Sequence, residues 1–385
     1  MSAPQIDPAE LTEVLAELVR TPSPNPPGDE EAVAMRIAAL LAAEGIDCQL
    51  DELAPGRPNL HTLLGPPSEL ALVLNGHSDT MPAGNGWSSD PYEPIVEGGR
   101  MTGLGACDMK AGLAAMVVVF RALARAGTPL RRAVRLDIVA DEEATGAGSL
   151  RAVACQPLPS AAVIVEPTQL ELVVVGNGQI NVAYELAGRA AHASAPELGA
   201  NAVAAAARAL AAIESWAASR ATPAHALIGA ESASIGTVAG GFRTSVVPDR
   251  CRFSVDLRVS PGRDPDAAAA EVDSIVASAI AGLAGISWSR SVEIRVPPFE
   301  TDPAAPVGVA LANAHRAVTG AEVTVTGMRA TTDAAAYAAA GVDTVIYGAG
   351  ALTDAHRPDE HVRLADVATL AEVLLGLTLE LALPE

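Results

Sequence analysis

The sequence has 385 residues, of which 50% are hydrophobic, 18% are charged and only 3% are aromatic. This length exceeds the roughly 250–300 residues at which a single core stops growing, so we expect two structural units with aliphatic cores. The formal net charge of −21 argues against binding to nucleic acid or to an anionic membrane surface, because both depend on clustered Lys and Arg.

The sequence shows no sign of export or membrane insertion. The N-terminal MSAPQIDPAELTEVL has no basic segment followed by an apolar run, and no stretch of about 18 residues is uninterruptedly apolar. The four cysteines lack C-x-x-C spacing, which argues against both a thiolate metal site and a disulfide framework. We therefore expect a cytoplasmic protein with free thiols.

The N-terminal part alternates between helix and strand patterns. Asp7-Pro8 is typical of a helix start, and the Pro-rich TPSPNPPGDE ends that helix. The expected elements are helices from Pro8 to about Arg20, from Glu30 to about Glu44 and over 109–126, and strands at 70–76 and 133–141. This alternation indicates an α/β sheet, on which ligand sites lie at the C-terminal ends of the strands.

From about residue 180 the pattern becomes strand, helix, strand, strand, helix, strand, which is the split βαβ order of a ferredoxin-like domain. We expect this domain at 180–295, as an insertion into a catalytic domain that spans 1–179 and 296–385. The second part of the catalytic domain should contain a helix at 304–318 and a Leu-rich helix from 364. The predicted fold is therefore a mixed α/β sheet flanked by helices, with an inserted βαββαβ lid or dimerisation domain.

Five polar clusters follow apolar strands or glycine-rich turns. They are LVLNGHSDT with His77 and Asp79, GLGACDMKAG with Asp108, IVADEEATGAGS with Glu142 and Glu143, VIVEPT with Glu166, and YGAGALTDAHRPDE with His356. Each cluster has an ordinary structural alternative when taken alone: a hydrogen-bonded strand-end His, an Asp helix cap or a solvated acidic loop. Taken together they favour a shared site.

The combined donor set is two histidines and several carboxylates, with no cysteine. Clustered carboxylates repel one another, so a cation usually compensates them in a partly dry site. Zn²⁺ accepts both imidazole and carboxylate, whereas Mg²⁺ and Ca²⁺ prefer oxygen alone. The set therefore matches the ligands of a hydrolytic zinc pair that shares a bridging carboxylate.

With these motifs the whole chain resembles the acetylornithine deacetylase, succinyl-diaminopimelate desuccinylase, aminoacylase and carboxypeptidase G family of di-zinc amidohydrolases. The family motifs GHSDT, G-x-G-x-x-D-M-K, D-E-E, E-P-T and A-H-x-P-D-E all occur in order. The resemblance implies two Zn²⁺, for which Co²⁺ or Mn²⁺ can substitute. It implies Asp108 as the bridging ligand, His77 and Glu166 at one metal, and Glu143 and His356 at the other.

The same resemblance implies roles for residues that are not metal ligands. Glu142 is implied as the general base that activates water, with Asp79 orienting His77. The remaining implied residues are His192 as oxyanion stabiliser, often supplied by a partner subunit, Arg258 for a substrate carboxylate, and Ser245 and Thr332 near the substrate. Ser245 stands where many relatives have Asn, Arg258 could instead pair with Asp256, and Thr332 could instead belong to a helix cap.

The function expected from the resemblance is hydrolysis of the amide bond of an N-acyl amino acid, nearest to acetylornithine deacetylase-like enzymes. A dipeptidase or carboxypeptidase acting on short peptides is the enzyme alternative. A non-catalytic binding protein on the same fold is the third candidate, and the retained Glu142 beside a full ligand set argues against it. A homodimer formed through the inserted domain is also expected.

Overall fold

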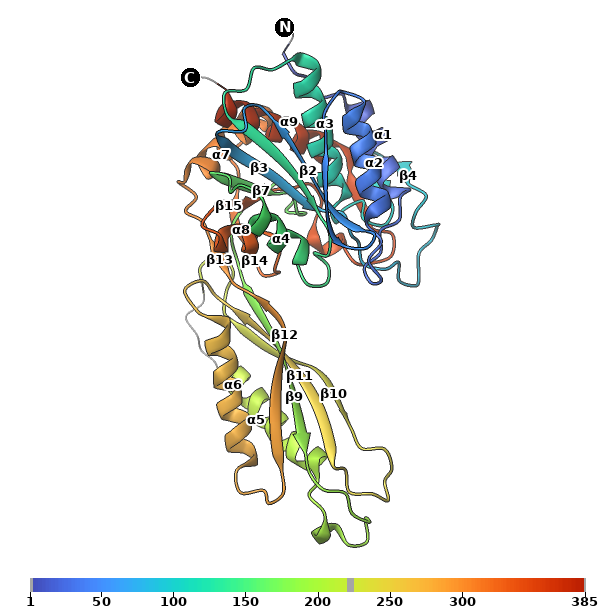
Figure 1. Cartoon of the computed structure of the whole chain (residues 1–385), viewed down its shortest axis with the longest axis vertical. Helices are drawn as coiled ribbons and strands as arrows, with labels where there is room; N and C mark the ends of the chain where they lie inside the picture. The colour runs from blue at the N-terminus through green and yellow to red at the C-terminus, as the bar shows by residue number, and fades with distance from the viewer. Residues whose placement is uncertain (1–2, 220–224, 384–385) are drawn as a thin grey trace. The chain divides into compact units, whose positions relative to one another are not determined.

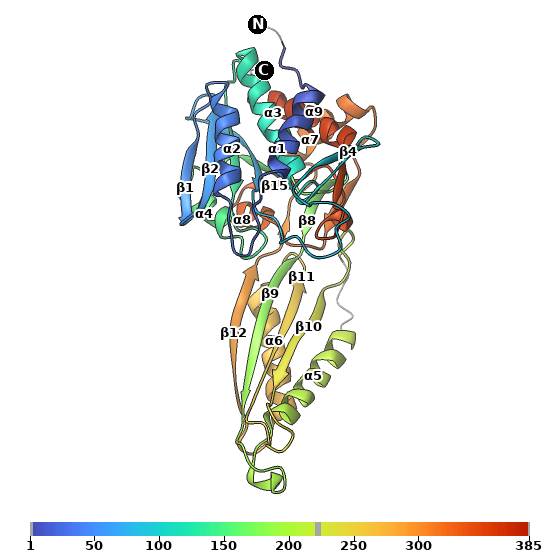
Figure 2. The same ribbon diagram turned by 90° about the vertical axis from the view of Figure 1, so that its right-hand side faces the viewer.

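A computed structural model describes residues 3–219 and 225–383 of the chain (Figures 1 and 2). The chain divides into two compact units. The first comprises Met1–Val174, Glu300–Gly327 and Thr332–Glu385, and the second comprises Val175–Phe299 and Met328–Thr331. Among the described residues, no helix combines the length and apolar character that crossing a bilayer requires.

A mixed nine-stranded sheet forms the centre of the first unit. Its main path runs β1-β2-β6-β3-β7-β15-β8-β13, and β14 pairs with β8. Strands β6, β3, β7 and β15 are parallel neighbours, whereas β1 and β2 extend one edge antiparallel. The strands are β1 (Gln49–Ala54), β2 (Arg57–Leu64), β3 (Leu70–His77), β6 (Ala133–Val139), β7 (Ala161–Ile164), β8 (Leu172–Gly176), β13 (Phe299–Glu300), β14 (Val325–Met328) and β15 (Asp343–Ile346).

Helices cover both faces of this sheet (Figure 1). One layer contains α1 (Pro8–Val19), α2 (Glu31–Ala42), α3 (Lys110–Ala126), α7 (Pro306–Thr319) and α9 (Leu364–Ala382). The other contains α4 (Ala147–Cys155) and α8 (Ala334–Ala339). A small antiparallel sheet of β4 (Ile95–Glu97), β5 (Arg100–Thr102) and β16 (His361–Arg363), and the short 3₁₀ helix η2 (Leu352–Asp354), complete the unit.

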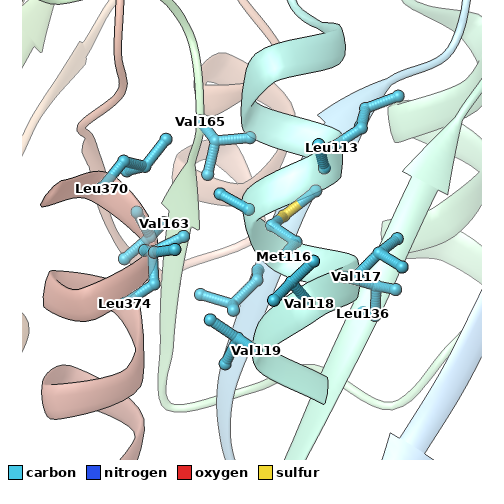
Figure 3. Close-up of a cluster of buried hydrophobic side chains, with 14 of the residues drawn as sticks. Leu113, Met116, Val117, Val118, Val119, Leu136, Val163, Val165, Leu370 and Leu374 are labelled. Carbon is cyan, nitrogen blue, oxygen red and sulfur yellow. The ribbon is translucent and has the colours of Figure 1, made fainter. Parts of the chain in front are cut away.

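Helix α3 is the most deeply buried helix of the first unit. Its side chains Met116 and Val119 pack beside Val163 of β7 and Leu370 and Leu374 of α9 (Figure 3). Fourteen of the 17 residues of α3 are buried, and only its C-terminal half carries arginines, Arg121 and Arg125, toward the surface, so α3 fits a position largely enclosed between the sheet and other helices. This packing fixes the N-terminal end of α3, which directly follows the Asp108 motif.

The second unit is a four-stranded antiparallel sheet with two helices on one face. The sheet order β10-β11-β9-β12 and the chain order β9-α5-β10-β11-α6-β12 are those of a ferredoxin-like fold (Figure 2). The elements are β9 (Gly178–Ala187), η1 (Pro196–Leu198), α5 (Ala202–Ser219), β10 (Ser232–Gly240), β11 (Arg250–Val259), α6 (Pro265–Ile280) and β12 (Ser287–Val296). The predicted fold class is thereby confirmed.

Candidate metal centre

Three adjacent parallel strands deliver the candidate ligands to one edge of the sheet. His77 is the last residue of β3, Glu143 follows the end of β6, and Glu166 follows the end of β7. Asp108 lies two residues before α3, and His356 lies in the loop between β15 and β16. Because parallel strands end at the same edge, segments far apart in sequence meet there.

The Asp108 carboxylate lies between two imidazoles. Its Oδ1 is 3.2 Å from Nε2 of His77, and its Oδ2 is 3.4 Å from Nε2 of His356. Glu143 Oε1 lies 2.9 Å from Nε2 of His356, and Glu166 Oε1 lies 3.8 Å from Nε2 of His77. Asp108 and both predicted ligand pairs therefore lie in one cluster.

The donor atoms of this cluster fit divalent metal ions. Ligand atoms of His77, Asp108 and Glu143 all lie within 4.8 Å of one another, and so do those of His77, Glu142 and Glu166. Imidazole nitrogen and carboxylate oxygen together suit Zn²⁺ and related transition metals. Cys107 is adjacent in sequence, but its buried thiol donates to the Ala351 carbonyl, so thiolate ligation is not part of the arrangement.

Burial and mutual repulsion shift the proton affinities of the cluster. Burial, followed by the neighbouring Asp108 carboxylate, raises the pKa of Glu166 well above its usual range. Hydrogen bonds to Asp108 and Glu143 raise the pKa of His356 to about 10. Burial opposes the charged form of His77, but its contacts with Asp108 and Asp79 outweigh this and its pKa is also raised. In the metal-free protein, protons therefore balance part of the carboxylate charge.

Metal binding is expected to release protons near neutral pH. His356 holds a proton there in the metal-free protein because its pKa is raised to about 10, and contacts with Asp108 and Asp79 raise the pKa of His77 as well. A ligand imidazole must be neutral, so these protons have to leave when metal binds. Apparent zinc affinity should therefore rise as the pH increases toward the pKa of His356. Calorimetric titration of zinc in two buffers of different ionisation enthalpy measures the protons released, and a value of zero would contradict this electrostatic description.

Asp79 binds the backbone of the loop after β6 that carries Glu142 and Glu143. Its carboxylate accepts the backbone N–H groups of Glu142 at 3.2 Å and of Glu143 at 3.1 Å. The nearest contact of His77 Nδ1 is the Asp79 carbonyl oxygen at 2.9 Å, while the Asp79 carboxylate lies at 3.5 Å. Asp79 therefore contacts the imidazole through its backbone as well as its carboxylate, and positions the two glutamates as well.

Glu142 lies inside the same cluster and is half-buried. Burial raises the pKa of its carboxyl well above the usual range, and the neighbouring Glu166 and Asp333 add to this effect. A carboxylate with raised proton affinity beside candidate metal ligands has the chemistry required of a general base.

Thr332 lies just before α8 and is buried. The Thr332 hydroxyl accepts the N–H of Ala334 at 3.2 Å, as in a helix cap. In the part of the chain that the structure describes, both oxygens of the adjacent Asp333 are buried without a hydrogen-bond partner. Burial raises the pKa of Asp333 to about 6. The helix-cap alternative for this segment is therefore present in the structure, and it is compatible with a place near substrate.

Glu360 also belongs to this centre, although the sequence motifs gave it no role. Its carboxylate accepts the backbone N–H groups of Cys107 at 2.8 Å and of Asp108 at 3.0 Å. Burial raises the pKa of Glu360 to about 7. Its position as the last acid of AHRPDE is the signal that could have identified it, because this carboxylate fixes the turn that carries Asp108.

Three of the predicted residues belong to the second unit. His192 is exposed, its Nδ1 lies 2.7 Å from the Ser194 hydroxyl, and its backbone bridges to Val246, next to Ser245. Arg258 on β11 forms a two-point ion pair with Asp256, with Nε 2.8 Å from Oδ1. The ordinary ion-pair alternative for Arg258 is thus present in this structure.

Comparison with known proteins places these observations in a family. Residues 73–380 match the model of peptidase family M20/M25/M40. The N-formyl-4-amino-5-aminomethyl-2-methylpyrimidine deformylase of Bacillus subtilis is 25% identical, over 95% of this chain and 93% of that protein. The N-acetyl-L-citrulline deacetylase of Xanthomonas campestris pv. campestris is 30% identical, over 94% of this chain and 96% of that protein.

A crystal structure of a tripeptidase from Staphylococcus aureus has the same fold, with a TM-score of 0.79 and 24% identity over 97% of this chain and 98% of that chain. The family match, the relatives aligned over nearly the whole chain and the histidine–carboxylate cluster agree with one another. The chain therefore belongs to peptidase family M20/M25/M40, and it is a metallohydrolase that acts on amide bonds.

Proposed function

We propose that this enzyme hydrolyses the amide bond of a small N-acyl amino acid. The observation that carries the proposal is the position of Glu142, whose carboxylate lies within 4.8 Å of the donor atoms of His77 and Glu166. A base beside a complete ligand set is what hydrolysis requires and what simple binding does not. The relative named as an N-acetyl-L-citrulline deacetylase supports an N-acyl amino acid as the substrate class.

We assign two metal ions to the cluster. Zinc is the expected metal because the donors are imidazole nitrogens and carboxylate oxygens, and cobalt or manganese can substitute for it. Asp108 would be shared between them, with His77 and Glu166 completing one site and Glu143 and His356 the other. When bound, such a pair polarises the substrate carbonyl and makes water more acidic.

The residues of the chain supply proton transfer and positioning. Glu142 takes a proton from the attacking water and returns it to the leaving nitrogen, a task suited to a carboxylate whose pKa is raised by burial. Asp79 holds the backbone of Glu142 through a hydrogen bond of 3.2 Å. Both roles use contacts within the first unit alone.

Three residues of the second unit, and Thr332 just before α8, are assigned to the substrate. His192 donates to the oxyanion that develops on the carbonyl. Arg258 binds the α-carboxylate, for which its planar guanidinium is suited once a substrate competes with Asp256. Ser245 and Thr332 supply hydroxyl groups near the substrate. The Ser245 side chain is shorter than the Asn that the resemblance implies at this position, so we expect it to change how the substrate is held.

Cleavage of dipeptides or short peptides is the second candidate, and the family includes peptidases by name. The two functions differ in the substrate's amino group, which is acylated in one case and a free ammonium in the other. The net charge of −21 could attract an ammonium substrate, but bound metal ions would neutralise several carboxylates of the cluster itself. The net charge alone therefore does not favour a free-amine peptide over an N-acyl amino acid.

An amine-release assay tests the proposed function. The enzyme, loaded in turn with zinc, cobalt and manganese, is given N-acetyl, N-succinyl and N-formyl amino acids beside free-amine dipeptides. We expect turnover of at least one N-acyl amino acid at higher kcat/KM than of any dipeptide. Turnover of dipeptides alone would replace the proposal with the peptidase alternative, and no amine release from any substrate would refute both.

We also propose a homodimer formed through the second unit. Two large apolar side chains near the β10–β11 hairpin support it, because Val238 is 60% exposed and Phe242 is 75% exposed. Light scattering should give about twice the chain mass of 39.0 kDa. A Phe242→Ser variant should shift the distribution toward the monomer, and a wild-type monomer at assay concentration would contradict the dimer.

A further inference from the structure

The segment after α1 lies along the end of β3. The backbone N–H of Asn25 donates to the Thr80 carbonyl at 2.8 Å, and the N–H of Thr80 donates to the Ser23 carbonyl at 2.9 Å. The Asn25 side chain is buried, with 3% of the residue exposed. Asn25 is therefore held by its backbone at a fixed place beside Asp79.

The amide nitrogen of Asn25 joins two buried carboxylates. Its Nδ2 donates to Oδ2 of Asp79 at 2.8 Å and to Oδ1 of Asp141 at 3.1 Å. A side-chain amide nitrogen has two hydrogens, so it can satisfy both acceptors at once. Two carboxylates this close would otherwise repel each other, and an aspartate at position 25 would remove both donors.

These two carboxylates control the backbone that carries Glu142 and Glu143. Asp79 accepts the N–H groups of both glutamates, and Asp141 directly precedes them in the chain. Asp141 has a φ of 69°, in the left-handed region that non-glycine residues seldom adopt. Asn25 therefore bonds both to the residue that starts this loop and to the residue that holds its amides.

A partly buried ion-pair network holds the other side of the loop. Arg57 donates to Oδ1 of Asp141 at 2.8 Å and to the fully buried Glu30 at 2.9 Å. Gly28 leaves room for this guanidinium, because a Cβ atom there would lie 2.3 Å from Cζ of Arg57. The series Glu30, Arg57, Asp141, Asn25 and Asp79 thus runs unbroken from the start of α2 to the candidate metal centre.

We propose that Asn25 is a positioning residue, which holds Asp79 and Asp141 together so that Glu142 and Glu143 keep the placement that catalysis and metal binding need. The inference rests on the proposed function, in which Glu142 is the general base and Glu143 is a metal ligand. Asn25 acts through its two hydrogen bonds, and neither reaches a metal ligand directly. Loss of the side chain should therefore loosen the loop without emptying the centre.

Asn25→Ala and Asn25→Asp test the proposal, with Thr301→Val as the matched control. Thr301 is buried in the same unit and its hydroxyl also makes two hydrogen bonds, to the carbonyl and from the N–H of Thr344. Its loss should therefore destabilise the fold comparably, without reaching the loop. Zinc affinity is measured with a competing chromophoric chelator, and amide exchange is measured by mass spectrometry on peptides covering residues 140–146.

We expect Asn25→Ala to weaken zinc binding about 10- to 100-fold and to lower kcat by a similar factor at saturating zinc, with KM changed less than about 3-fold. Amide exchange of the 140–146 peptide should accelerate about tenfold or more. Asn25→Asp, although it has the same size, should lower kcat at least as far as Asn25→Ala. Thr301→Val should leave exchange of this peptide and zinc affinity unchanged.

Wild-type exchange and zinc affinity in Asn25→Ala would overturn the proposal. It would also be overturned if Asn25→Asp were clearly milder than Asn25→Ala, because that order indicates that the side chain only fills space. Exchange and zinc binding need no substrate, so they decide the role of Asn25 even if the amine-release assay refutes the proposed function.

Discussion

Replacing Glu142 by glutamine is expected to lower kcat by about 10²- to 10⁴-fold while the metal content stays near two ions per chain. The amide has nearly the same shape as the carboxylate but cannot accept the proton. Glu142 lies in a group with His77 and Glu166, and burial raises the pKa of its carboxyl. Steady-state kinetics and metal analysis on the same preparation measure the two quantities.

Glu97→Gln is the control for this experiment. Glu97 is an exposed residue at the end of β4, so the same chemical change there should leave kcat at the wild-type value. Unchanged turnover in Glu142→Gln would remove the general-base assignment. A non-catalytic binding protein on this fold would show no turnover even as the wild type, so the assay of the wild-type protein distinguishes that possibility.

Replacing Asp108 by asparagine is expected to have the largest effect on metal binding. The carboxylate lies 3.2 Å from one imidazole and 3.4 Å from the other, so its loss removes the charge shared by both candidate sites. Substitution of a residue that only supports a metal ligand lowers metal affinity roughly 10- to 100-fold, and Asp108→Asn should lower zinc affinity by more than this. Zinc content should fall to about one ion or fewer per chain. Turnover should fall with it.

Asp343→Asn is the matched control, because Asp343 is an exposed aspartate at the start of β15. It should retain full zinc content and turnover. If Asp108→Asn kept two zinc ions per chain with wild-type affinity, a bridging role for Asp108 would be untenable. The metal measurement decides this point without a substrate.

Most of the fold follows from patterns that are local in the sequence. Asp7-Pro8 predicts the start of α1, and the Asp7 side chain does accept the Ala9 N–H at 2.9 Å. Strand β1 shows where such patterns fail. Its sequence QLDELA is rich in helix formers and lies largely exposed, so its strand conformation comes from pairing with β2.

The cluster of candidate ligands could be predicted in part because the motifs of His77, Glu143 and Glu166 follow the ends of three neighbouring parallel strands. Asn25 and Arg57, which support the loop that carries Glu142 and Glu143, could not be predicted. The bond from Asn25 to Asp79 spans 54 residues, and the one from Arg57 to Asp141 spans 84. In the sequence, TPSPNPPGDE indicates only a helix end, because no local periodicity records a hydrogen bond made across the fold.

Anomalous X-ray scattering from zinc-loaded crystals would locate the metal ions and their ligands. We expect two zinc peaks about 3.5–4 Å apart, with Asp108 bound to both, His77 and Glu166 on one ion, and Glu143 and His356 on the other. A single peak, or two peaks that do not share Asp108, would contradict this arrangement.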